Sequence, residues 1–232
     1  MEGFVPKGRP SQPNRALGDP PPKPRERASA KGDRKAQELG DLYFAADNYA
    51  VALEYYRRAL EDEGLRSETA SQESLLRIGT QIVECLRHRG DLNEAVEALH
   101  DLHRKLRPHV TREQIGRLSS RLGILLFERG RYRTAHRAAS LAYRLLRDTT
   151  LNLDLGHTEM CLGAVALRTG EWGAAREHFE GAIATYRRAD YQSGMAAAYN
   201  NLGLLHKNQC RFKESVRFLR SEERRVGKEC RL

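Results

Sequence analysis

Residues 162–182 read LGAVALRTGEWGAAREHFEGA and show one unit of a pattern that recurs along most of the chain. Apolar residues return every three or four positions on both sides of Gly170, which is the spacing of one face of an α-helix. Glycine readily adopts the left-handed conformation that ends helices. The stretch therefore predicts two helices joined by a short turn at Gly170.

The same unit occurs five times. A Leu-Gly pair begins at residues 39, 122, 162 and 202, and Ile82-Val83 marks a less regular copy, so the spacings are 43, 40, 40 and 40 residues. A small residue stands twelve positions after the glycine or its equivalent, at Ala52, Ala95, Ala135, Ala175 and Ser215. Repeats of 20–50 residues are typical of solenoids, and alternation of apolar and polar residues at period two is absent. The sequence predicts an all-α fold in which helix pairs stack.

The repeat resembles the tetratricopeptide repeat (TPR), whose L-G-x2-Y pattern is kept at Leu39, Gly40 and Tyr43. The period of about 40 residues resembles a long-period subclass found in cell-polarity adaptors and in the sensory parts of bacterial transcriptional regulators. The early tryptophan of the family is missing. The resemblance implies an α-solenoid, a TPR superhelix, over residues 34–219, with about four and a half repeats. The predicted helix pairs are 34–46 and 49–63, 71–89 and 92–106, 112–129 and 132–147, 152–169 and 172–189, and 192–209 and 212–219.

Three kinds of residue are predicted to shape each pair. The glycine after the leucine allows the second helix to approach closely, with the small residue twelve positions later as its complement. Glycines are predicted to end three of the first helices, at Gly90, Gly130 and Gly170, and the pair Asp47-Asn48 is predicted to do so in the first copy, since Asn tolerates the same conformation. Large aromatic residues are predicted to start the second helices by packing, at Tyr49, Tyr132, Trp172 and Phe212.

The two ends of the chain differ from the body. Seven of the eight prolines lie in residues 1–24, so residues 1–33 are predicted to be a disordered, proline-rich basic tail. Residues 220–230, RSEERRVGKEC, match the in-frame translation of a common sequencing adapter. Residues 220–232 are therefore predicted to be non-native, and the chain a fragment of a larger protein.

The net charge of +9 belongs mainly to these ends. Residues 1–35 hold nine basic and four acidic residues, whereas residues 36–219 hold 26 basic and 24 acidic ones. A nearly neutral body makes nucleic acid an unfavourable partner for the fragment. No apolar run reaches the roughly 20 residues of a membrane span, and four widely spaced cysteines favour reduced thiols and a cytoplasmic location.

Enzyme chemistry has no support in the sequence. The motifs of phosphate-binding loops, metalloproteases and serine hydrolases are absent. His100, His103 and His109 lack the ligand spacing of structural zinc sites, so solvated histidines are the preferred interpretation. Cys161 is interpreted as a packed thiol. We therefore predict that the chain is not an enzyme and binds neither a cofactor nor a metal.

The resemblance implies that the first helices line a concave binding groove. The groove positions carried over to this chain are Arg77, Glu84, Arg87, Arg117, Ile124, Phe127, His157, Arg168, Asn200, Asn201, Lys207 and Asn208. Guanidinium and amide groups suit a protein or peptide, including an acidic one whose carboxylates pair with arginine. Ordinary solvated helix faces are the alternative interpretation.

Three functions are weighed. The first is a non-catalytic protein- or peptide-binding scaffold. The second is the N-terminal regulatory or sensor segment of a truncated bacterial transcriptional regulator whose ATPase and DNA-binding domains are missing. The third, RNA binding through the basic tail, is the least favoured and predicts binding that weakens steeply with salt. The identity of a partner and the oligomeric state are not encoded in these patterns.

Overall fold

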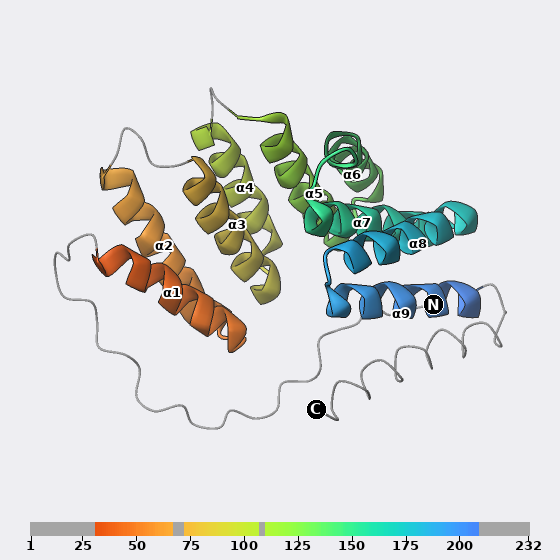
Figure 1. The fold of residues 1–232 in the computed structure, drawn as a ribbon, viewed down its shortest axis with the longest axis horizontal. Helices are drawn as coiled ribbons and strands as arrows, with labels where there is room; N and C mark the ends of the chain where they lie inside the picture. The colour runs from red at the N-terminus through yellow and green to blue at the C-terminus, as the bar shows by residue number, and fades with distance from the viewer. Residues whose placement is uncertain (1–30, 67–71, 107–109, 209–232) are drawn as a thin grey trace.

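The computed structural model describes residues 31–66, 72–106 and 110–208, and within these ranges every regular element is a helix (Figure 1). The helices are α1 (Lys31–Ala45), α2 (Tyr49–Arg66), α3 (Gln72–Arg89), α4 (Leu92–Leu106), α5 (Arg112–Glu128), α6 (Tyr132–Leu146), α7 (Asn152–Thr169), α8 (Trp172–Arg188) and α9 (Gln192–Asn208).

The helices pack as successive pairs, which confirms the predicted all-α solenoid. Within the pairs, α1 packs on α2, α3 on α4, α5 on α6 and α7 on α8, and each later first helix packs on the second helix before it. Figure 1 shows the pairs following one another from α1 to α9. The helix bounds agree with the predicted ones to within three residues. Helix α1 begins at Lys31, inside the range predicted as tail, and the predicted helix 212–219 lies outside the described residues, as does 220–232.

Glycine allows the close approach of the two helices. The predicted complement Ala135 lies near Gly123, with its carbonyl oxygen 3.5 Å from a Cβ placed there, but in other pairs the nearest partner is a different residue. A Cβ atom on Gly163 would lie 2.6 Å from Cε1 of Phe179, and one on Gly40 would lie 2.7 Å from Cε1 of Tyr56. These aromatic residues stand sixteen positions after the glycine, whereas the predicted complement stands twelve positions after it. The reason is geometric: an aromatic ring one turn farther along the second helix reaches back over the bare backbone. The four described small residues of the predicted set are nevertheless fully buried.

The tight turns are closed by residues in the left-handed region. Gly90, Gly130 and Gly170 have φ values of 87°, 73° and 83°, as predicted. In the first pair the predicted Asp47-Asn48 does close the turn, and the residue with positive φ is Asp47 (57°) rather than the Asn that was expected to tolerate it. The carboxylate of Asp47 also accepts a hydrogen bond from the Tyr49 hydroxyl at 2.5 Å, which is the local side-chain contact that lets Asp tolerate this conformation.

Trp172 departs from the packing role that was predicted for it. It starts α8, but 37% of it is exposed. The large side chains that fill this part of the core are instead Phe179 and Tyr186, both fully buried. Among the described helices, none is long and apolar enough to cross a membrane.

Candidate binding groove

A groove of about 610 Å³ runs along the side of the array that the first helices form. Its lining comes from every first helix, from Phe44 at the end of α1 to Ala197 in α9. The central floor is apolar and is made by Ile124, Phe127, Met160 and Ala164 of α5 and α7. All four are half-buried, so they present apolar surface to the groove.

An aromatic cluster lies at each end of this floor. At the N-terminal end, the rings of Tyr49 and His88 stack with centroids 4.4 Å apart, and Phe44 meets His88 edge-on at 5.8 Å. At the C-terminal end, His157 meets Tyr186 at 5.6 Å and Tyr191 at 5.9 Å. The groove is thus bounded by rings that offer both apolar faces and polar edges.

Six ion pairs join seven side chains of α3, α5 and α7 into one continuous ladder along the groove. They are Glu73–Arg117 at 2.7 Å, Arg117–Asp154 at 3.5 Å, Asp154–Arg121 at 3.6 Å, Arg121–Glu84 at 3.1 Å, Glu84–Arg87 at 2.7 Å and Arg87–Glu128 at 2.9 Å. Four carboxylates face three guanidinium groups, so the ladder has no spare positive charge. Its arginines already have the partners that a ligand carboxylate would need to replace.

The ladder sets the protonation of its central acid. Burial raises the pKa of Glu84, but the charges of Arg121 and Arg87 more than offset this, and the net pKa is lowered. Burial lowers the pKa of the Arg87 guanidinium, but the negative charges of Glu84 and Glu128 raise it by more. The net pKa of Arg87 is therefore raised. Both groups are therefore held firmly in their charged forms.

His157 brings a neutral polar group into the groove. Burial first, and then the charge of Arg121, lower the pKa of this imidazole to about 4. Its Nδ1 is buried and has no hydrogen-bond partner in the structure. A buried nitrogen without a partner costs free energy, so this atom is not a point of contact for a ligand, and His157 offers the groove mainly the face and edge of a neutral ring.

The structure brings together five of the twelve predicted groove residues in the groove lining: Glu84, Arg87, Ile124, Phe127 and His157. Arg117 joins them through the ladder. Arg77 donates a hydrogen bond to Gln37 of α1, and Arg168 donates to the Tyr132 hydroxyl at 3.0 Å, so both are engaged beside the groove. The four residues predicted on α9, Asn200, Asn201, Lys207 and Asn208, do not line it.

Sequence reasoning missed Arg121, Tyr186 and Tyr191, which all line the groove. Arg121 stands four residues after Arg117 and so shares its helix face, a signal that was available. Tyr186 belongs to a second helix and reaches the groove over Gly156, where a Cβ would lie 2.4 Å from its ring. The local sequence does not reveal that route, because it depends on the packing of two helices.

The groove contains one thiol, that of Cys161, which lies on the buried side of α7. Burial, with a smaller contribution from the charge of Glu128, raises the pKa of this thiol to about 12. A thiol that stays protonated is a poor nucleophile.

His100 is exposed, and among the described residues no group of His, Cys, Asp and Glu is arranged to hold a metal ion.

Two sequence-family models match the chain. Both describe the tetratricopeptide repeat, one over residues 154–224 and the other over residues 37–61. Together with the glycine contacts and the stacked helix pairs, they decide the family. The chain is a tetratricopeptide repeat protein. No curated protein matches it significantly in sequence.

Solved structures resemble the TPR array closely in fold. BtubC from P. vanneervenii is 15% identical, with 86% of this chain and 81% of that chain covered and a TM-score of 0.66. A putative kinesin light chain of Podosopora anserina with TPR-like repeats is 15% identical, with coverages of 86% and 96% and a TM-score of 0.61. A signal transduction ATPase with a TPR sensor from Pyrococcus horikoshii is 14% identical, with a TM-score of 0.55. In that last case the match covers 84% of this chain but 33% of the ATPase chain.

Proposed function

We propose that this TPR protein is a non-catalytic scaffold that binds a segment of a partner protein in the groove. The TPR fold is typical of protein-interaction scaffolds. The observation that carries the proposal is the continuous apolar floor of Ile124, Phe127, Met160 and Ala164, with an aromatic cluster at each end. Grooves that bind peptides use apolar pockets for affinity and a few polar groups for orientation.

The ligand of the groove is an extended or helical segment anchored by apolar side chains. The arginines predicted to pair with an acidic peptide, Arg87 and Arg117, are held by carboxylates of the ladder. A ligand that took over these arginines would displace the ladder carboxylates. Most of the displaced carboxylates would stay half-buried without a partner, which costs free energy.

Selection of peptides from a random displayed library against the full chain tests this function. The selected peptides should contain two or more large apolar residues, and their affinity should fall at least roughly tenfold in Ile124→Asp, since a charge would then face an apolar anchor. Leu141→Asp is the matched control, because Leu141 is 37% exposed on α6, away from the groove lining. Equal affinity for Ile124→Asp and Leu141→Asp would remove the groove from the function.

A second candidate is a sensor segment of a longer signalling protein. The specific observation is the match to about a third of the ATPase whose own description names a TPR sensor. This function requires that the reading frame of the source locus continue beyond the repeats into a phosphate-binding loop. Resequencing the locus past residue 219 is the direct test, and a genuine stop codon after Leu232 would sink this candidate.

A further inference from the structure

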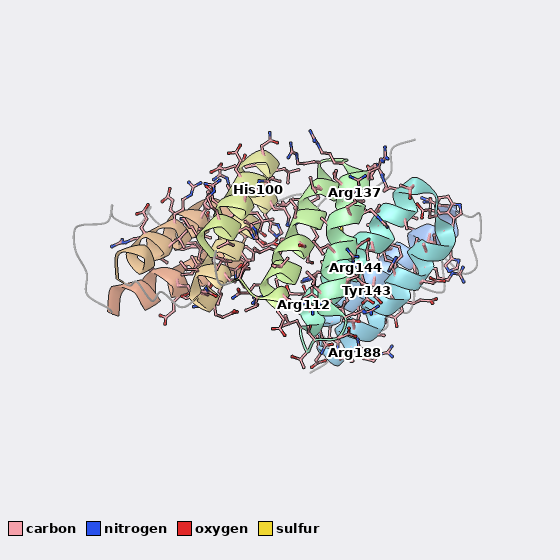
Figure 2. All side chains as sticks on the ribbon, turned by 90° about the horizontal axis from the view of Figure 1, so that it is seen from above. His100, Arg112, Arg137, Tyr143, Arg144 and Arg188 are labelled. Carbon is pink, nitrogen blue, oxygen red and sulfur yellow. The ribbon has the colours of Figure 1, made fainter. Side chains whose placement is uncertain are left out.

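The solvent side of α6 carries a row of four arginines: Arg133, Arg137, Arg144 and Arg147. Their spacing of four, seven and three residues places them along one face of the helix and its C-terminal end. All four are exposed. At 1.5 Å per residue the row is about 21 Å long, and Figure 2 shows Arg137 and Arg144 along it. We name these four residues the arginine row.

The arginine row is only partly neutralised by the rest of the protein: Glu171 lines the same hollow as Arg133 and Arg137 but forms no ion pair with either. Residues 129–147 contain six arginines and no acidic residue. Arg133, Arg137 and Arg144 make no ion pair or hydrogen bond with any residue that the structure describes, and Arg147 only meets its exposed neighbour Asp148 at 3.4 Å. The groove shows the opposite pattern, because every arginine of the ladder has a carboxylate partner.

The solenoid does not require arginine at these positions. The residues of the other second helices that correspond to Arg137 are Glu54, Glu97 and Glu177, and all three are exposed. At the position of Arg137, the three other second helices that were compared thus carry glutamate, and only α6 carries arginine. Like charges three or four residues apart destabilise a helix by a few tenths of a kcal/mol, so the row is a feature that packing does not explain.

We propose that the arginine row binds an acidic segment of a partner protein. Carboxylates that repeat every three or four residues on a helix can lie alongside α6 and pair with successive guanidinium groups, which bind carboxylates in a two-pronged geometry. The proposal does not depend on the groove, because none of the four arginines lines it.

The surroundings of the row favour an acidic protein segment over a nucleic acid. Glu97 and Glu177 stand on α4 and α8, the second helices of the preceding and following pairs. A long phosphate backbone that ran beyond one helix would meet these carboxylates and be repelled, whereas a short acidic helix covers the row alone. Residues 36–219 carry only two more basic than acidic residues, so the wide basic surface typical of nucleic-acid binding is missing.

The test uses a fluorescent helical peptide of alanine and glutamine with glutamates at i, i+4, i+11 and i+14, which is the spacing of the row. A second peptide has the same composition with the glutamates distributed around the helix. Binding to the full chain is measured by anisotropy at about 50 mM salt, where screening of exposed charges is weak. The charge-reversal pair Arg137→Glu and Arg144→Glu is compared with Arg104→Glu and Lys105→Glu on α4, two exposed residues whose reversal changes the net charge equally.

The expected result is that the spaced peptide binds more tightly than the distributed one. The α6 pair should weaken this binding by roughly tenfold or more and the α4 pair by less than about threefold. Equal losses in the two pairs would mean that only net charge matters, and the proposal would fall. It would also fall if the spaced peptide did not bind, if a single-stranded oligonucleotide or an anionic vesicle bound more tightly to the same residues, or if sedimentation showed that the row joins two copies of this chain.

Discussion

At the scale of single residues, the most unusual side chain is Glu159, a carboxylate buried between α7 and α8. It is 7% exposed, and its Oε1 occupies the space that a side chain at Gly181 would take. The corresponding residues of the other described first helices are Ala36, Gly79, Ser119 and Tyr199. Burial raises the pKa of Glu159, although Thr185 donates a hydrogen bond to it and the charge of Arg188 acts in the opposite direction. The other oxygen, Oε2, has no partner.

Glu159→Met should therefore stabilise the protein by about 1–3 kcal/mol at pH 7, because it removes a buried carboxylate with an unsatisfied oxygen. A carboxylate whose folded pKa is raised favours the folded state while protonated, so the wild type loses stability as pH rises from the unfolded value toward the folded one. The gain from Glu159→Met should thus shrink at pH 4. Urea unfolding at both pH values measures it, with the exposed Glu180→Met as control. A gain that is larger at pH 4 than at pH 7 would contradict this account.

The glycines offer a matched comparison at the same scale. A Cβ at position 163 would lie 2.6 Å from the ring of the fully buried Phe179, whereas one at Gly173 would meet nothing within 4 Å. Gly163→Ala should destabilise the protein by about 1–3 kcal/mol through overpacking. Gly173→Ala should stabilise it by up to about 1 kcal/mol, because alanine is the better helix former. Thermal unfolding of both variants measures the difference, and similar effects would show that α7 and α8 are not closely packed here.

At the scale of elements, the turns decide where each helix ends. Gly170 closes α7 with a φ of 83°, and Asp47 and Asp190 occupy the same left-handed region at other turns. Gly170→Ala should cost about 1–2 kcal/mol. Gly170→Asn should cost less, since Asn, like Asp, tolerates this conformation. Chemical denaturation of the two variants gives the order, and an equal cost would point to side-chain crowding rather than to backbone conformation.

At the scale of the whole molecule, the ladder connects three successive repeats through Glu84. Glu84→Gln should destabilise the fold by about 1–3 kcal/mol at pH 7, because Arg87 and Arg121 each lose one charged partner. The lowered folded pKa means that the carboxylate's contribution is fully present above the unfolded value of about 4.5 and is lost as pH falls through the folded value. Wild type and variant should therefore converge only once the pH falls below that lowered folded value. A constant difference down to pH 2 in urea unfolding would exclude the ladder as its source.

The sequence predicted the elements well because their signals are local. Periodicity and glycine placement lie within each 40-residue unit, so α3 to α8 were placed to within one or two residues. The residues of the groove were harder to predict. Ile124, Phe127 and His157 were found because register alone puts them on the groove side, whereas the pairing of Arg117 with Glu73 and Asp154 depends on which residues of neighbouring helices face each other. Summing charge over the whole body also hid the arginine row.

The ladder has a mechanical consequence for the groove. A solenoid bends according to the distance between neighbouring repeats on its inner side, and the ladder ties α3, α5 and α7 together on that side. The curvature of the array in this region is therefore set by ion pairs, whereas the two helices of each pair are held together by apolar contacts. Salt screens the exposed end of the ladder at Glu73 most, and it screens the partly buried pairs around Glu84 much less. We therefore expect rising ionic strength to loosen the inner side first at Glu73, at the start of α3, while the ties around Glu84 keep the middle repeats together.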